Sequence, residues 1–354
     1  MFPRLEYIHW IDGRPAAATH DLGTTNQQLG RPLDRLGDHP DPATGKTLQD
    51  QLAAEIGVER GQLLVTAGTT HANFIATATA LGTAGSDVLV ESPGYEPLRA
   101  TPTGLGATVR RFDRPAAEGF ALDPDRVADG LTRETAVVAV TDRHNPSGRS
   151  SSPDRITTIA SIAGDHGARL LVDEVYAPFA GGSAAKGAFG GPTAAGTEDT
   201  VVTGALTKFF GLGDLRIGWL VADHAFVEQA REVAAHVPAV SGTTRQLAKR
   251  MLANRDQEVE TARKRAAENA ALLEQFLDDR TDLSGAVDGA CPIAFPSHAD
   301  RDGDAVAEAA WESGILVVPG RFFGDRRRFR IAAAYEPAAT EGSLRALGEV
   351  LDAL

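Results

Sequence analysis

The sequence is poor in lysine. Of its 354 residues, 35 are lysine or arginine, and only five of these are lysine. One of the five, Lys208, lies in the apolar and glycine-rich segment LTKFFGLGDLRIGW (206–219). Lysine can lose its proton and act as a nucleophilic amine, whereas the arginine guanidinium stays protonated. In a chain that otherwise uses arginine for positive charge, this placement predicts a chemical role for Lys208.

Three further shortages exclude whole classes of protein. Cys291 is the only cysteine, so no disulfide can form within the chain, which favours a cytoplasmic location. No apolar run approaches the roughly 18 residues of a membrane-spanning helix, and the first ten residues, MFPRLEYIHW, lack the pattern of a signal peptide. The net charge of −13 argues against a basic surface. We therefore expect neither a membrane nor a nucleic-acid partner.

Short apolar runs alternate with helical patterns between residues 48 and 222. Five of these runs read as buried strands that end in polar or turn residues, namely GQLLVTAGT (61–69), SDVLVESPG (86–94), TAVVAVTDRHNP (135–146), ARLLVDEVY (168–176) and TVVTGAL (200–206). Helix candidates lie between them, among them residues 70–83 and 150–167. This alternation predicts an α/β domain with a mostly parallel sheet. Ligands of such sheets bind where the strands end.

The pattern changes on both sides of this region. Residues 1–35 read as an irregular arm that joins a smaller domain, and residues 36–240 form the large domain. Residues 241–354 form the smaller α+β domain, in which residues 243–279 read as one long or kinked helix with charged residues on its exposed face. The sequence therefore predicts two domains and an N-terminal arm.

Two short motifs and the histidines could suggest a nucleotide or metal site, but none of them matches the full pattern that such a site requires. PDPATGKT (40–47) ends like a phosphate-binding P-loop, but Pro40 stands where the first glycine is needed. In GLGDLRIG (211–218), which resembles a dinucleotide fingerprint, Arg216 takes the place of the third glycine. The nine histidines include no closely spaced ligand pair, so we expect no metal site.

Chemically distinctive residues follow the predicted strands in order. They are Gly68, Thr69 and Thr70 after the first strand, Tyr95 after the second, Asn145 after the third, Asp173 and Tyr176 at the end of the fourth, Thr207, Lys208 and Arg216 after the fifth, and Arg330 within the apolar run RFRIAAA (328–334). Each has an ordinary explanation alone, as a turn, a cap or a packing residue. Their joint order at successive strand ends indicates one site for a ligand with a phosphate, a ring and a carbonyl that condenses with an amine.

These motifs carry a resemblance to a known family. With HNPSG (144–148), DEVY (173–176) and LTKFFGLGDLRIGW, the chain resembles the class I/II aminotransferases, which are fold type I enzymes dependent on pyridoxal 5′-phosphate. The matching motifs run from DLGTTN (21–26) to RFRIAAA, so the resemblance covers nearly the whole chain. It implies a large domain around a mostly parallel seven-stranded sheet, a smaller α+β domain, and a homodimer with active sites at the interface.

The resemblance also assigns roles around the cofactor ring. Lys208 is implied to form a Schiff base with the cofactor aldehyde and later to move a proton as a free amine. Asp173 is implied to pair with the ring nitrogen and keep it protonated. Tyr176 and Asn145 are implied to hydrogen-bond the 3′ oxygen, and Tyr95 to stack on the ring.

A second group of implied roles concerns the cofactor phosphate. Arg216, Thr70 and the backbone of Thr69 are implied to bind it, because a dianion suits charge-assisted donors. Gly68 forms the turn before this helix N-terminus, and Thr207 lies beside the reactive lysine.

The resemblance implies two substrate contacts and shows two departures from the family pattern. Arg330 is implied to clamp the substrate α-carboxylate, with Gly23 passing over the substrate. Ala205 stands where many members have a phosphate-binding serine, for which Thr207 or Thr203 could substitute. His39 stands where members usually have a tyrosine that reaches the partner subunit's phosphate.

The implied activity is transfer of an amino group between an L-amino acid and a 2-oxo acid by a ping-pong mechanism. A lyase, decarboxylase or racemase that uses the same cofactor and Lys208 is the alternative among enzymes. A regulator without turnover is a third hypothesis, but no DNA-binding domain fits before residue 35. The identity of the amino donor stays open at this point.

Overall fold

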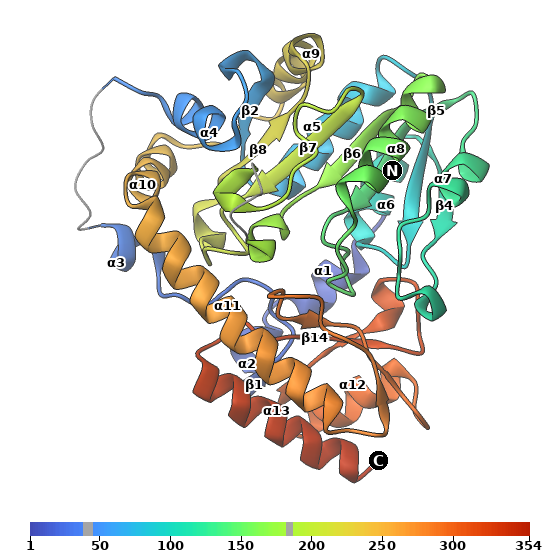
Figure 1. Ribbon diagram of the computed structural model, residues 1–354, viewed down its shortest axis with the longest axis vertical. Coiled ribbons are helices and arrows are strands. Elements are labelled where there is room, and N and C mark those ends of the chain that lie inside the picture. The colour runs from blue at the N-terminus through green and yellow to red at the C-terminus, as the bar shows by residue number, and fades with distance from the viewer. Residues whose placement is uncertain (38–44, 182–186) are drawn as a thin grey trace.

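A seven-stranded sheet forms the centre of the structure (Figure 1). The computed structural model describes residues 1–37, 45–181 and 187–354, so His39 and Pro40 lie outside the described residues. The strands of the sheet are β2 (Leu63–Thr66), β3 (Asp87–Ser92), β4 (Thr108–Asp113), β5 (Thr135–Thr141), β6 (Arg169–Asp173), β7 (Thr200–Ala205) and β8 (Gly218–Val221). Their order is β2-β8-β7-β6-β5-β3-β4, and only the pairs that include β8 are antiparallel. The expected mostly parallel sheet is confirmed.

The central strands are buried on both faces. Every residue of β5 is buried, and its alternate side chains pack into different hydrophobic clusters. Val138 and Val140 belong to the cluster on one face, whereas Val137 and Ala139 belong to the cluster on the other. A strand covered on both faces needs a continuous apolar run, which is why the sequence pattern revealed β5.

Helices cover both faces of the sheet. On one face lie α5 (Thr69–Leu81), α6 (Glu96–Gly104) and α9 (His224–Ala235), and on the other lie α4 (Leu48–Ile56), α7 (Pro124–Gly130) and α8 (Pro153–Asp165). A further short helix, α3 (Pro32–Leu36), precedes the first gap in the described chain. None of the helices within the described ranges is long and apolar enough to cross a membrane.

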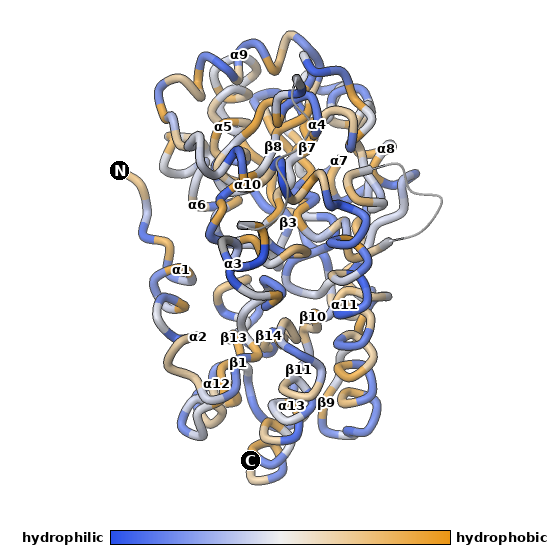
Figure 2. The backbone as a smooth tube through the Cα atoms, turned by 90° about the vertical axis from the view of Figure 1, so that its left-hand side faces the viewer, coloured by the Kyte–Doolittle hydropathy of each residue, from blue (hydrophilic) through white to orange (hydrophobic). Residues whose placement is uncertain are grey.

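A second group of elements lies below the sheet in Figure 1. It contains α12 (Gly303–Glu312), α13 (Pro337–Asp352), β1 (His20–Asp21), β9 (Leu283–Ser284), β10 (Ile293–Ala294), β11 (Ser297–His298), β12 (Ile315–Leu316), β13 (Val318–Pro319) and β14 (Phe329–Ala332). Leu22, near the N-terminus, shares a hydrophobic cluster here with Phe329 and Leu347. Figure 2 shows the two groups stacked along the long axis, with the N-terminal segment running beside both. The division of the chain at residues 35 and 240 stays a prediction.

One local prediction left two alternatives open, and another was wrong. Of the long and the kinked helix expected over 243–279, the structure has the interrupted form, with α10 (Gly242–Ala253) and α11 (Arg255–Asp278) separated at Asn254, which leaves the helical conformation with φ −112° and ψ 23°. The N-terminal arm is not irregular throughout, since it contains α1 (Glu6–Ile11) and α2 (Arg14–Ala17). The Glu96 carboxylate accepts hydrogen bonds from the backbone N–H groups of Glu6 and Tyr7, a tertiary contact that local pattern does not reveal.

Candidate active site

A cavity of about 400 Å³ lies at the edge of the sheet where the parallel strands end. The predicted residues that line it are Gly23, Thr69, Thr70, Tyr95, Asn145, Asp173, Tyr176, Thr207, Lys208, Arg216 and Arg330. Because β8 is antiparallel to β7, it begins at the edge where β7 ends. Arg216, two residues before β8, therefore reaches the same cavity as Lys208.

Lys208 has the properties of a reactive amine. Its Nζ donates a hydrogen bond of 2.9 Å to Thr25 Oγ1. Burial lowers the pKa of Lys208 to about 8, and the cations Arg330 and Arg216 act in the same direction while Asp173 opposes them. At neutral to mildly alkaline pH a useful fraction of this amine is therefore unprotonated.

Asp173 lies at the end of β6, held by a short chain of hydrogen bonds. Its Oδ2 accepts from Asn73 Nδ2 at 2.8 Å, and Asn73 Oδ1 accepts from Thr203 Oγ1 at 2.6 Å. Its Oδ1 accepts from the Val175 backbone at 3.1 Å. Burial raises the pKa of Asp173 to about 6, although the bonds from Asn73 and Val175 oppose this shift. Asp173 is thus a fixed carboxylate at neutral pH, suited to a cationic ring nitrogen.

Three of the four tyrosines of the chain line the cavity. They are Tyr7, Tyr95 and Tyr176. The rings of Tyr7 and Tyr95 meet edge to face with centroids 6.4 Å apart, and Tyr176 Oη donates to Thr25 Oγ1 at 3.1 Å. Burial raises the pKa of both Tyr95 and Tyr176, so these hydroxyls are neutral hydrogen-bonding groups.

The N-terminus of α5 fits a phosphate group. Thr69 Oγ1 is buried without a hydrogen-bond partner, and the first backbone N–H groups of a helix attract anions. Gly68, at φ 80°, lies behind these residues and does not line the cavity, but a Cβ there would lie 3.4 Å from the Arg216 guanidinium carbon. An unpartnered hydroxyl, a helix N-terminus and a guanidinium therefore converge on one anion site, as pyridoxal 5′-phosphate requires.

Arg330 lines the same cavity as Lys208 and is only 1% exposed. Its Nη1 donates to Asn145 Oδ1 at 3.0 Å, while Nη2 donates to Tyr7 Oη at 2.9 Å and to the Gly23 carbonyl at 3.0 Å. Its Nε is buried and has no partner among the described residues. A fully buried guanidinium with a spare donor is suited to bind a carboxylate.

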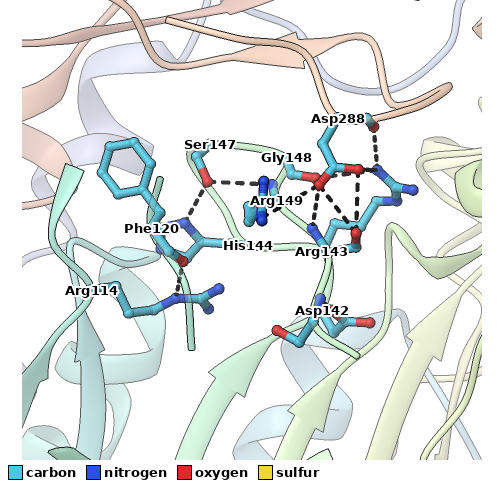
Figure 3. Close-up of polar contacts among 11 residues, drawn as sticks. Arg114, Phe120, Asp142, Arg143, His144, Ser147, Gly148, Arg149 and Asp288 are labelled. Carbon is cyan, nitrogen blue, oxygen red and sulfur yellow. Dashed lines mark hydrogen bonds and ion pairs between the residues drawn. The ribbon is translucent and has the colours of Figure 1, made fainter. Parts of the chain in front are cut away.

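Asn145 belongs to a loop that a carboxylate distant in sequence holds on both sides. Figure 3 shows this carboxylate, Asp288, in contact with Arg143. Asp288 accepts from Arg143 Nη1 at 3.2 Å and from the Ser150 backbone N–H at 3.0 Å. The backbone carbonyl of Asp288 also accepts from Arg143 Nη1. These contacts fix the loop before and after Asn145 and thereby the amide that contacts Arg330.

A buried ion pair supports the same loop from the sheet. Arg114 Nη1 and Glu91 Oε2 lie 2.5 Å apart, with side chains 0% and 1% exposed. Glu91 Oε1 accepts from both the backbone N–H and the hydroxyl of Thr141, at 2.8 and 2.6 Å. The Thr141 hydroxyl in turn accepts from the Asn145 backbone at 2.9 Å. Figure 3 also shows Arg114 bonded to the Phe120 carbonyl.

The two departures from the family pattern have different outcomes. Ala205 is buried and does not line the cavity. Of its two suggested substitutes, Thr207 lines the cavity, whereas the hydroxyl of Thr203 is bonded to Asn73 and supports Asp173 instead. His39 lies outside the described residues, so its contact stays a prediction.

Sequence reasoning missed several residues that complete the site. Tyr7 contacts Arg330, and Thr25 accepts hydrogen bonds from Lys208 and Tyr176. Asn73 orients Asp173, and Thr141 orients the backbone of Asn145. The scarcity of tyrosine was a usable signal for Tyr7, since rare residues often have specific roles. Threonine and asparagine are common, and their contacts depend on elements distant in sequence.

The strand order, the lysine beyond β7 and the anion site at α5 define a class of protein, the fold type I transferases that use pyridoxal 5′-phosphate. The chain belongs to the class I and II aminotransferase family, whose model matches residues 34–347. It is a transferase of this family, and its cofactor is pyridoxal 5′-phosphate.

Known proteins of similar sequence and structure agree with this assignment. The chain is 29% identical to capreomycidine synthase of Streptomyces vinaceus over 91% of its own length and 83% of that protein. It is 26% identical to histidinol-phosphate aminotransferase of Halorubrum lacusprofundi, over 90% and 84% of the two chains. A PLP-dependent aminotransferase from Streptococcus suis has the same fold, with a TM-score of 0.85, 21% identity, and 99% and 98% coverage.

Proposed function

We propose that the chain transfers an amino group between an L-amino acid and a 2-oxo acid in two half-reactions at this cavity. The observation that carries the proposal is Lys208, an amine with a lowered pKa that faces both Asp173 and Arg330. Bound pyridoxal 5′-phosphate supplies an aldehyde that condenses with amines and a ring that withdraws electrons from a neighbouring carbon.

Four sets of residues bind and orient the reactants in this proposal. Arg216, Thr69 and Thr70 hold the phosphate, and Asp173 holds a proton on the ring nitrogen because its carboxylate is buried and fixed. Tyr95 lies against the ring face. Arg330 binds the substrate α-carboxylate, with Asn145 and Tyr7 fixing the guanidinium.

Lys208 is the proton carrier in the proposal. Its free Nζ would accept the proton from the substrate Cα and deliver it to a neighbouring carbon of the bound cofactor. Thr25 Oγ1 accepts a hydrogen bond from Nζ and holds it near this position, while Tyr176 Oη donates to the same threonine oxygen. Binding of the α-carboxylate by Arg330 favours a substrate that keeps this group, which counts modestly against loss of carbon dioxide.

One relative supports a second candidate. The chain is 30% identical to threonine-phosphate decarboxylase of Sinorhizobium, although over only 49% of its length and 46% of that protein. A decarboxylase, lyase or racemase would use Lys208 in the same way. Measuring carbon dioxide release and donor racemisation beside amino transfer separates these reactions.

The assembly and the location of the protein are part of the same proposal. Members of the family resembled by the sequence form homodimers with active sites at the interface, and we propose the same assembly here. Its test is the mass of the purified protein in solution. The cytoplasmic location also stays a prediction.

The visible spectrum of the purified protein tests the core of the proposal. Borohydride reduction followed by peptide mapping should find the cofactor on Lys208, and amino donors should then be screened against 2-oxoglutarate. Lys208→Ala should keep the fold and lose all transamination. Normal turnover by that variant, or attachment of the cofactor to another lysine, contradicts the proposal.

A further inference from the structure

The charged side chains that line the cavity can be assigned almost completely. Among the described lining residues the cations are Lys208, Arg216 and Arg330, and the carboxylates are Asp173 and Asp214. The proposed function uses the three cations for the amine, the phosphate and the α-carboxylate. It uses Asp173 for the ring nitrogen. Asp214 is the one remaining charge, and no part of the proposed reaction requires it.

Asp214 is a free hydrogen-bond acceptor. It lies in a short 3-10 turn (Gly213–Leu215) and is exposed. Within the described part of the chain, its carboxylate has neither a hydrogen bond nor an ion pair. It is therefore available to a ligand, although it lies only two residues from Arg216.

A second unpartnered acceptor belongs to Asn26, a residue that packs against the same turn. The side-chain nitrogen of Asn26 is 2.8 Å from the position that a Cβ on Gly213 would occupy, so this amide packs against the turn that carries Asp214. Asn26 also lines the cavity, and its Oδ1 is buried without a partner. Two neighbouring acceptors without donors fit a group rich in N–H donors.

The helix α1 adds an apolar wall to the same cavity. Ile8 and Ile11 line it, and Ile8 is 38% exposed, one of the few large hydrophobic side chains of the described residues with such exposure. An isoleucine left open to a cavity gains by contact with the methylene groups of a ligand. The cavity thus offers apolar contact and an acidic group in addition to the α-carboxylate site.

We propose that the preferred amino donor is a basic amino acid, with an aliphatic side chain that ends in an ammonium or guanidinium group. Asp214 is the specificity-determining residue, and it binds the terminal cation while Ile8 and Ile11 contact the stem. This inference rests on the proposed function. An acidic side chain is disfavoured, because no uncommitted cation among the described lining residues is left to pair with it.

Donor selectivity of the holoenzyme tests the inference. The kcat/KM for L-ornithine should exceed that for the uncharged L-norleucine and for L-aspartate. Asp214→Asn keeps the size of the side chain and removes its charge, so the ornithine-to-norleucine ratio should fall about tenfold, the effect of losing one charge-assisted hydrogen bond. Asp129→Asn is the matched control, because Asp129 is exposed at the end of α7 and does not line the cavity.

A binding measurement separates this inference from the proposed reaction. α-Methylornithine and α-methylleucine have no Cα proton to transfer, so absorbance titration of the holoenzyme gives their dissociation constants without transamination. The preference for α-methylornithine should fall about tenfold in Asp214→Asn and should weaken in high salt. If the holoenzyme turns over no donor, the proposed function is refuted, but the inference about donor binding is not. An unchanged preference in Asp214→Asn, or stronger binding of the uncharged analogue by the original protein, overturns the inference.

Discussion

The buried pair of Glu91 and Arg114 gives the sharpest stability prediction. Glu91→Leu leaves the Arg114 guanidinium, 0% exposed, without its carboxylate, although Nη2 of that arginine already has no partner among the described residues. It also removes the acceptor of two Thr141 groups. Breaking one side of a buried ion pair costs about 3–5 kcal/mol, and a domain has only about 5–15 kcal/mol in total.

The assay is urea unfolding followed by tryptophan fluorescence and by circular dichroism. We expect the free energy of unfolding of Glu91→Leu to fall by about 4 kcal/mol, with an unchanged dependence on urea concentration. Glu91→Gln should lose less, because its amide oxygen still accepts from Thr141. Glu118→Leu is the control, since Glu118 pairs with Arg126 at the surface, where such a pair contributes little.

The same variants test the link from this pair to the site. Because Glu91 holds Thr141 and Thr141 holds the Asn145 backbone, Glu91→Leu should weaken donor binding, seen as a raised KM, more than it lowers kcat. Glu91→Gln keeps the acceptor of Thr141 and should change KM less. A loss of stability below about 1 kcal/mol in Glu91→Leu, or one equal to that of the Glu118 control, refutes the reasoning about burial. An unchanged KM in Glu91→Leu refutes the link to Asn145.

Three further predictions concern the ionisable groups of the cavity. The rate at which the apoprotein binds pyridoxal 5′-phosphate covalently should rise with pH through about 8 and then level off. The reason is that the pKa of Lys208 is lowered to about 8 and only the unprotonated amine reacts. A rate that levels off only near the ordinary pKa of lysine contradicts this prediction. Arg330→Lys should raise the donor KM about tenfold or more, since a lysine loses the fork of donors that binds a carboxylate, with little change in the circular dichroism spectrum; an unchanged KM assigns the carboxylate elsewhere. Asn73→Leu removes a hydrogen bond that lowers the pKa of Asp173, so the acid limb of the pH–rate profile should move to higher pH. If the acid limb stays in place or moves to lower pH, Asp173 is not the group whose titration produces it.

Sequence reasoning predicted the central part of the fold because burial on both faces requires apolar runs. β5 and β6 have no polar alternation to obscure them. The edge strand β4 was not identified, since its residues are mostly exposed and include Arg110 and Arg111. The antiparallel strand β8 is short and begins within the segment at 206–219, so its residues were interpreted as part of that motif and not as a strand.

The sequence by itself determined the class of the protein and the residues of one wall of its site. Asp173 ends a strand, Lys208 and Asn145 each follow one, and parallel strands necessarily bring such residues to one edge. The chemical roles of these three residues could be predicted because polar or charged side chains are unusual in such apolar surroundings.

The residues that the N-terminal arm contributes to the cavity could be identified only from the tertiary structure. Tyr7, Thr25, Asn26 and the isoleucines of α1 reach the cavity because the N-terminal arm folds back over the sheet, where Glu96 holds the start of α1. That contact spans 89 residues between Tyr7 and Glu96, and no local periodicity encodes it. That Asp214, a residue of the motif at 206–219, lines the same cavity as the N-terminal arm also follows only from the tertiary structure.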